Sequence, residues 1–335
     1  MSHNETSRRQ FLQSVGAGAA LASSGLIPSV ATAKEIAKKK PQPESLVKTL
    51  FESLNEKQRE KVCFDWNHKD KKRGLLRTRV ANNWFVTDPR VNDDFYTSDQ
   101  QEIIRAVFQG LISPEWHKKY DQQLEDDCGG WGDQSIAIFG EPGNGKFEMA
   151  LTGRHLTLRC DGNSADHVAF GGPIFYGHAP EEDETKEHDG NVFWEQAIAA
   201  NKVFEMLDGK QREMAKAAKT PREQNVPFRG KKAKRDGISI AEFSSDQKEQ
   251  VQKTLQTLLA MFRKSDQAEA AMCLKKQGGL DACNLAFYTD HDIGDDGVWD
   301  NWRLEGPSFV WHFRGSPHVH VWVNLADDPK VKLNA

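Results

Sequence analysis

Hydrophobic and polar positions along the chain follow two different periods, which predicts a mixture of helices and strands. Apolar residues recur three or four positions apart within 45–62 and within 248–264, as they do on one face of an amphipathic helix. Other stretches alternate apolar and polar residues with a period of two, which is typical of strands. These stretches are 135–139, 146–160 and 318–324.

Polar residues mark the expected starts of several helices. A short polar residue followed three positions later by glutamine can form a capping box, in which each side chain hydrogen-bonds the other residue's backbone. Together with the strand patterns, these caps predict an α+β fold: a mostly antiparallel sheet with helices packed on it and inserted between its strands. The capping pairs are Asn55 with Gln58, Ser98 with Gln101, Asp208 with Gln211, and Ser244 with Gln247.

One short sequence recurs along the chain: FESLNEKQRE, at 51–60, parallels FEMLDGKQRE, at 204–213. A diverged duplication would explain this likeness, and so would two helices that use the same capping chemistry. Because no further similarity continues on either side, we favour the second interpretation.

The stretch GEPGNGK, at 140–146, has the spacing of a phosphate-binding loop and follows a predicted strand. A true loop of this kind needs a Ser or Thr after the Lys to ligate Mg²⁺, and then a helix. Here Phe147 follows Lys146, and the next residues alternate with a period of two. We therefore predict a turn between antiparallel strands, with Gly143 and Gly145 supplying positive φ, and no nucleotide site.

The composition is that of a globular protein, with 38% hydrophobic and 28% charged residues among 335. The formal net charge is only −4, which indicates no nucleic-acid partner. The charged stretches at 179–191 and 219–237 are expected to be solvated loops.

The first residues carry the features of an export signal. SRRQFL, at 7–12, resembles the twin-arginine motif, a weakly apolar run follows, and Ala31-Thr32-Ala33 has the form of a cleavage site. The apolar run is short and rich in Gly and Ser, so we expect no stable membrane span after cleavage, and a periplasmic or extracellular location. The predicted organisation is a signal peptide at 1–33, a linker at 34–44, a single α+β domain at 45–329 and a tail at 330–335.

The five cysteines could pair in an oxidising compartment, although at least one would be left over. Cys273 and Cys283 flank a Gly-Gly turn and are the pair that we would test first for a disulfide. The plainer interpretation of Cys63, Cys128 and Cys160 is that each is a small buried hydrophobic residue.

Histidines on predicted strands form the candidate site. His318 and His320 are two residues apart, so both imidazoles leave the same face of a strand. Such a pair is a common way to supply two ligands to one Zn²⁺, Cu²⁺ or Fe²⁺ ion. His155, within the predicted strand 146–160, lies on the face that avoids the neighbouring leucines. His312 precedes a Gly-Ser-Pro turn, so a hairpin could bring it near His318 or His320.

The competing interpretation is that these imidazoles are solvated side chains on an exposed sheet face. The other histidines have no comparable context, with His178 as the one exception that we single out. Trp311 and Trp322 could wall a pocket near the pair, although core packing is the safer assumption.

Three stretches carry a resemblance to a family: 138–158, 171–180 and 303–324. They are similar to the bacterial domain-of-unknown-function family 3500, whose pattern is matched by Gly153 to Leu158, by Gly306 to Phe309, and in part by the paired histidines. The chain departs from the pattern at His312, near which the family usually has an acidic residue. The resemblance implies no activity, but it supports His155, His318 and His320 as one cluster.

The leading hypothesis is a transition-metal site that His155, His318 and His320 build on a sheet face, with His312 as a fourth ligand. Copper or zinc suits imidazole ligands, and iron is the third choice. An open coordination position would make the protein a metal-dependent hydrolase or oxidoreductase of unknown substrate. The alternative is a non-enzymatic periplasmic protein that binds a small ligand on the same face without metal.

Overall fold

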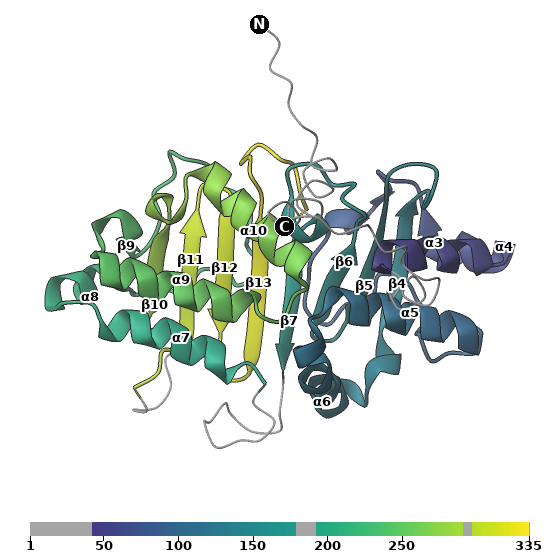
Figure 1. The fold of residues 1–335 in the computed structure, drawn as a ribbon, viewed down its shortest axis with the longest axis horizontal. Helices are drawn as coiled ribbons and strands as arrows, with labels where there is room; N and C mark the ends of the chain where they lie inside the picture. The colour runs from purple at the N-terminus through teal and green to yellow at the C-terminus, as the bar shows by residue number, and fades with distance from the viewer. Residues whose placement is uncertain (1–41, 179–191, 291–296, 335) are drawn as a thin grey trace, which may run out of the picture.

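A computed structural model describes residues 42–178, 192–290 and 297–334 (Figure 1). The expected signal peptide and most of the expected linker lie outside these residues. The helices of the described part are α3 (Pro43–Ser53), α4 (Glu56–Val62), α5 (Ser98–Leu111), α6 (His117–Cys128), α7 (Trp194–Glu205), α8 (Gly209–Ala215), α9 (Ser245–Leu259) and α10 (Lys264–Gln277).

One large mixed sheet carries the fold, and a two-stranded hairpin stands apart from it. The strands are β1 (Cys63–Phe64), β2 (Lys69–Asp70), β3 (Gly74–Leu75), β4 (Ser135–Gly140), β5 (Phe147–Gly153), β6 (Leu156–Cys160), β7 (Ile174–His178), β8 (Lys216–Ala217), β9 (Ile238–Ser239), β10 (Asn284–Tyr288), β11 (Asn301–Gly306), β12 (Phe309–Arg314) and β13 (Val319–Leu325). Their order is β1-β4-β5-β6-β7-β13-β12-β11-β10-β8, with β9 also paired to β10. Only the edge pairs β1–β4 and β8–β10 are parallel, so the predicted α+β fold with a mostly antiparallel sheet is confirmed.

The sheet is built from two copies of one unit. In each copy two helices lead to a short edge strand, two longer helices follow, and four antiparallel strands complete the unit. The first copy runs from α3 to β7 and the second from α7 to β13. In Figure 1 the first copy is purple to teal and the second is green to yellow.

The capping boxes repeat with the copies. Gln58 donates its side-chain amide to Gln100 at 2.8 Å, and Gln247 donates to Gln211 at 2.7 Å. The box before α5 begins at Thr97, one residue earlier than predicted, and the other three boxes form as predicted. The recurring sequence at 51–60 and 204–213 therefore marks corresponding helices, and the interpretation that the two stretches share only capping chemistry is wrong.

Both copies also contain a contact between a thiol and a side-chain amide. The cysteine comes first in the sequence in one copy and the glutamine comes first in the other. The Gln134 amide lies 3.4 Å from the Cys128 sulfur, and at the corresponding positions the Gln277 amide lies 3.4 Å from the Cys283 sulfur. All five cysteines are free thiols, so the pairing of Cys273 with Cys283 is wrong. The Cys283 sulfur instead takes part in the duplicated contact.

A local two-fold axis passes between the central strands β7 and β13. Tyr176 and Leu325 occupy corresponding places, because each pairs with the first residue of the strand before its own. Two positions earlier, Ile174 and Val323 also correspond, and these two residues pair with each other across β7 and β13. The axis therefore runs between Ile174 and Val323.

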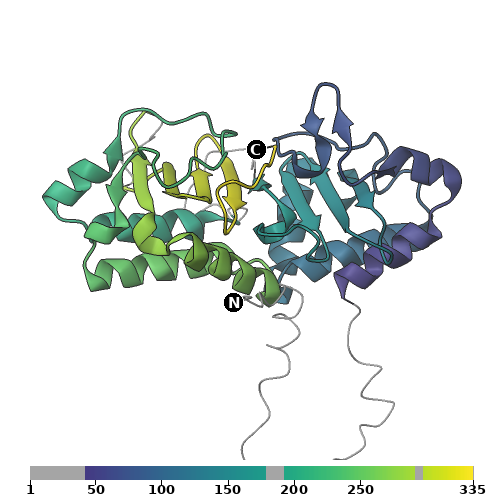
Figure 2. The same ribbon diagram turned by 90° about the horizontal axis from the view of Figure 1, so that it is seen from above.

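The two faces of the sheet are covered differently. Figure 2 shows the helices gathered on one side and the long connections 65–97 and 218–244 on the other. On the helical side, Trp311 and Val321 belong to the main core. On the other side, Trp322 packs in a small cluster with residues of the connections. Alternate residues of β12 and β13 thus enter different environments.

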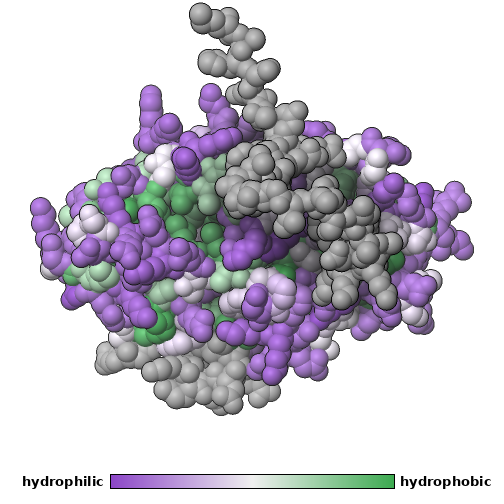
Figure 3. All heavy atoms as spheres, viewed as in Figure 1, coloured by the Kyte–Doolittle hydropathy of each residue, from purple (hydrophilic) through white to green (hydrophobic). Residues whose placement is uncertain are grey.

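The helical face is largely hydrophilic, with apolar side chains showing among the polar ones (Figure 3). An apolar groove of about 310 Å³ lies between α9 and α10, where Leu255 and Leu280 line it. At the corresponding positions of the first copy, Phe108 and Trp131 bring their rings to 4.5 Å between centroids. The smaller side chains of the second copy leave the groove open.

The predicted hairpin at GEPGNGK is confirmed, because β4 and β5 are antiparallel and Gly140 pairs with Phe147. Gly140 and Gly143 have positive φ, of 78° and 93°, whereas Gly145 does not. A Cβ at Gly140 would approach the Lys146 carbonyl oxygen to 2.1 Å, so the turn between β4 and β5 requires glycine at position 140.

Both ends of the described chain differ from the predicted boundaries. Helix α3 begins at Pro43, inside the expected linker. The expected tail is attached to the fold, since the Asn334 backbone N–H donates to the Thr78 hydroxyl at 3.0 Å. None of the helices in the described ranges is long and apolar enough to span a membrane.

The duplication offers a matched test of the capping interaction. Gln58 is 4% exposed and also donates to the Phe95 carbonyl, so Gln58→Ala leaves buried partners unsatisfied. We expect the free energy of unfolding, measured in urea, to fall by about 2 kcal/mol. Gln211→Ala removes the corresponding box where water can replace the lost bonds, and should cost about 1 kcal/mol or less. Equal losses in the two variants would contradict this account.

Candidate metal centre

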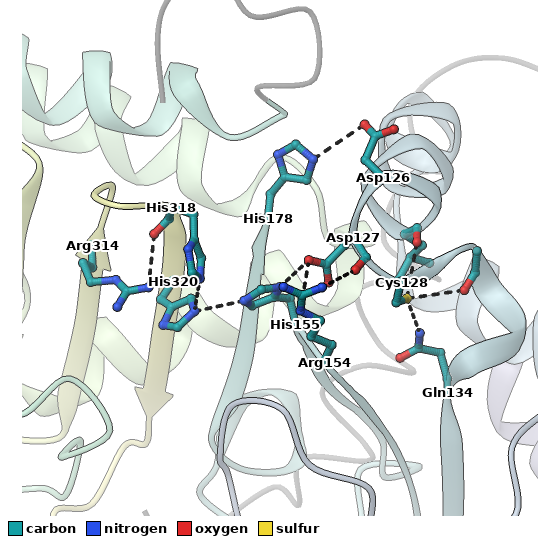
Figure 4. Close-up of polar contacts among 12 residues, drawn as sticks. Asp126, Asp127, Cys128, Gln134, Arg154, His155, His178, Arg314, His318 and His320 are labelled. Atoms are coloured by element: carbon teal, nitrogen blue, oxygen red, sulfur yellow. Dashed lines mark hydrogen bonds and ion pairs between the residues drawn. The ribbon is translucent and has the colours of Figure 1, made fainter. Parts of the chain in front are cut away.

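Three imidazoles from segments far apart in the sequence converge on one point (Figure 4). Nε2 of His320 lies 2.9 Å from Nε2 of His155 and 3.0 Å from Nε2 of His318. Each residue offers one ring nitrogen, and these three atoms all lie within 4.8 Å of one another. This cluster, His155, His318 and His320, is called the triad below.

His155 reaches the triad from a turn, so its predicted place on a strand is wrong. The stretch 146–160 forms two antiparallel strands, β5 and β6, joined by the turn Arg154–His155. Strand β6 pairs with β7, and β7 pairs with β13, so His155 and His320 come from strands two apart. The ring of His155 must therefore cross β7 to meet His320.

Gly177 makes that crossing possible. It is the residue of β7 that pairs with His320, and it carries no side chain on the face where the triad lies. A Cβ at this position would approach His155 Cδ2 to 3.1 Å and the Val319 carbonyl oxygen to 2.2 Å. Glycine at 177 thus opens the path between the two imidazoles.

Two carboxylates orient the triad. Asp127, near the end of α6, lies 2.7 Å from Nδ1 of His155. Glu223, in the connection after β8, lies 3.0 Å from Nδ1 of His320. A neutral imidazole has one N–H, and a carboxylate acceptor at Nδ1 places that hydrogen on Nδ1. Nε2 of both histidines is then a bare lone pair that points into the triad.

These tautomers leave one contact without a hydrogen. Nε2 of His155 and Nε2 of His320 are 2.9 Å apart. When both rings are neutral, their N–H groups are directed to the carboxylates and no hydrogen lies between these two atoms. Two lone pairs at this distance repel each other unless a cation lies between them. In metal centres, carboxylates hold histidine ligands in this same tautomer.

The environment lowers the pKa of two members of the triad, His318 and His320. Burial lowers the pKa of His318 to about 3, with contributions from the neighbouring His320 and Arg314. Burial also lowers the pKa of His320 to about 4, against the opposing effect of Glu223. Burial alone would raise the pKa of Glu223, but its hydrogen bond with His320 and the nearby positive charge hold it below the usual value.

Aromatic rings wall one side of the triad. The Phe175 ring lies 5.2 Å from that of His320 and 4.3 Å from that of Trp322, between centroids. The Trp322 indole N–H donates to Glu223 at 3.4 Å. Trp311, the other tryptophan considered from the sequence, lies on the helical face instead.

The structure separates His312 from the triad. The expected hairpin of β12 and β13 is present, but its register places Arg314 opposite His320 and His312 opposite Trp322. His312 is fully buried, and its Nδ1 accepts a hydrogen bond from Arg303 at 3.3 Å. Burial and the Arg303 charge hold the pKa of His312 well below its usual value.

His178 lies beside the triad but belongs to the other face, since it pairs with Val319. It is fully buried, and its Nε2 is 3.7 Å from a carboxylate oxygen of Asp126. Burial lowers its pKa.

Several residues of the site gave no sequence signal. Glu223 lies in the basic stretch that was expected to be a solvated loop, and Asp127 lies in an acidic helix end. Their roles depend on contacts across 97 and 28 positions of the chain, to His320 and His155 respectively. Gly177 lies in the FYGHAP stretch, directly before His178, and a single glycine there gives no sign of a site.

Filling the space at Gly177 tests this geometry. Gly177→Ala should force β7 away from β13 and displace His155, and we expect the free energy of unfolding of metal-free protein to fall by about 2–3 kcal/mol. Gly145→Ala is the matched control, because nothing lies within 4 Å of the added Cβ. Urea unfolding in a chelator measures both, and an unchanged midpoint for Gly177→Ala would contradict the close approach.

Comparisons with known proteins identify a family. Searches among curated proteins and among solved structures each gave no match. A family model described as protein of unknown function (DUF3500) matches residues 38–326, nearly the whole chain. The protein therefore belongs to the DUF3500 family, as the sequence motifs predicted.

Proposed function

We propose that the protein binds one transition-metal ion through Nε2 of His155, His318 and His320. The observation that carries this proposal is the 2.9 Å contact between Nε2 of His155 and Nε2 of His320, whose Nδ1 atoms face the carboxylates of Asp127 and Glu223. A cation at the centre would turn this repulsion into coordination.

The distances suit such an ion. Metal–nitrogen bonds of about 2.0–2.1 Å at tetrahedral angles place two ligand nitrogens about 3.3 Å apart. The Nε2 atoms are 2.9 and 3.0 Å apart for the two closest pairs, so small ring rotations would admit the ion. Copper and zinc suit a set of imidazole nitrogens best, with iron as the third choice.

The number of ligands favours reaction over a purely structural role. Structural zinc sites use four protein ligands, whereas catalytic sites use three and keep one position open. His155 and His320 are 5% and 4% exposed, and His318 is half-buried, so the open position would lie on the His318 side. A metal-dependent hydrolase or oxidoreductase fits this arrangement.

We also propose that the protein works in the periplasm or outside the cell, after export by the twin-arginine route. The support is the SRRQFL motif followed by a weakly apolar run and an A-x-A site, all in residues outside the described ranges. That route carries folded proteins, which suits a protein that acquires its metal before export.

Metal analysis of protein purified through its own export route tests the proposal. We expect about one equivalent of copper or zinc per chain, lost in the double variant His318→Ala/His320→Ala. His167→Ala is the control, because this exposed histidine pairs only with Asp327 among its described neighbours, far from the triad in the fold. The control should keep its metal.

The same samples show whether the metal stabilises the fold. Added Cu²⁺ or Zn²⁺ should raise the melting temperature of the wild type and of His167→Ala but not of the double variant. Absence of metal from the wild type, together with equal melting temperatures with and without added ion, would contradict the proposal.

The carboxylate partners should tune affinity without being ligands. Asp127→Asn keeps the shape of the side chain but weakens its hold on Nδ1 of His155, and we expect metal affinity to fall about 10- to 100-fold. Asp327→Asn alters a similar pair, 2.8 Å from Nδ1 of His167, and should leave affinity unchanged. Competition with a chelator of known affinity measures both variants, and equal affinities would argue against the role of Asp127.

A further inference from the structure

We propose that the open position beside the triad binds an anion, and that the substrate class of the site is a small molecule with a carboxylate group. This inference rests on the proposed metal site and adds what that site would bind. It is carried by two arginines that flank the triad from opposite sides and by the charge balance of the groups around it (Figure 4).

The side chains around the triad cancel one another's charge. Asp127 and Glu223 are the two carboxylates, and each has an arginine beside it. Arg154 Nη1 donates to the Asp127 carbonyl oxygen at 2.7 Å, and its Nε lies 3.7 Å from the Asp127 carboxylate. Arg314 Nε lies 3.5 Å from the Glu223 carboxylate.

A divalent ion in the triad would therefore keep its charge. The three imidazoles are neutral ligands, and the two carboxylates are already balanced by the two arginines. An uncompensated double charge in a largely buried site is costly, because the surrounding groups screen it less than water does. An anion in the open position offsets this charge, and a neutral ligand does not.

The arginines also supply hydrogen-bond donors for an oxyanion. Arg314 Nη2 donates to the His318 carbonyl oxygen at 3.2 Å, which fixes the guanidinium beside the most exposed histidine of the triad. Among the described residues, Nη1 of Arg314 and Nη2 of Arg154 have no hydrogen-bond partner. The guanidinium group matches the geometry of a carboxylate, which it can bind through two parallel N–H groups.

The shape of the site sets the direction of approach. Phe175 and Trp322 close one side of the triad, and the half-buried His318 leaves the other side as the entrance. Arg314, the last residue of β12, lies beside His318 at this entrance. Arg154 lies in the turn next to His155, with its side chain 46% exposed. A ligand that enters past His318 meets one guanidinium on each side.

Cobalt-loaded protein gives a direct readout, because the visible spectrum of Co²⁺ reports its ligands. We expect acetate to change the spectrum of the full chain saturably, whereas acetamide, which is similar in shape but uncharged, should leave it unchanged. Arg314→Gln and Arg154→Gln should each weaken acetate binding at least fivefold. Arg314→Lys keeps the charge but loses the paired N–H groups, so it should weaken acetate binding less than Arg314→Gln does.

Arg105→Gln is the matched control, because this arginine pairs with Asp121 on the helical side of the first copy and should bind acetate as the wild type does. Circular dichroism and elemental cobalt content establish that each variant is folded and loaded. A loaded wild type whose spectrum acetate does not change, or acetate affinities unaffected by both glutamine variants, would overturn the anion site and leave the metal site standing. Failure of the wild type to bind Co²⁺ would overturn the metal site itself.

Discussion

The antiparallel pairing of β7 with β13 is the constraint on which the rest of the structure depends. It joins the sheets of the two copies into one. Without it, β7 and β13 would each be an edge strand with one side unpaired. It also sets Gly177 against His320, which brings His155 of the first copy to the paired histidines of the second. The two carboxylates follow the same division, with Asp127 from the first copy and Glu223 from the second. The site exists only because the copies pair in this register.

The two-fold axis relates the triad to an equivalent position at the other end of β7 and β13, and that position carries no histidine cluster among the described residues. At the position that corresponds to His155 stands Ser308, whose hydroxyl donates to the Ala326 carbonyl oxygen at 2.7 Å. Val168 pairs with Ala326 there, as His320 pairs with Gly177 at the site, and its apolar side chain packs against Ala326. Ordinary packing and backbone contacts satisfy that end of the sheet. The two equivalent positions thus differ in role: one carries the imidazoles, and the other has a structural role.

Part of the fold and of the candidate site could be predicted from the sequence, because it depends on local interactions. The capping boxes, the turn after β4 and the common face of His318 and His320 each depend on residues within a few positions of one another. The duplication could not be predicted, because the two copies have identical side chains mainly where a specific hydrogen bond needs them, as at Gln58 and Gln211. In the core, any apolar side chain of suitable volume is tolerated, so the sequences differ there. The sequence predicts the hairpin of β12 and β13 but not its register, and for this reason His312 was expected in the site. A register is set by long-range pairing, which no single stretch of sequence contains.

The contact between His155 and His320 is what distinguishes the site from an ordinary pair of a histidine with a carboxylate. The surface pair of His167 and Asp327 has a carboxylate at 2.8 Å from Nδ1, much as His155 has at 2.7 Å, so the carboxylate alone distinguishes nothing. The difference lies at the other ring nitrogen, which in His155 points at a second imidazole held by its own carboxylate. Burial of that arrangement is unfavourable, because in the neutral rings the two Nε2 lone pairs face each other, and burial lowers the pKa values of His318 and His320. Sequences that break local rules in this way do so at functional sites, where a ligand supplies the missing interaction.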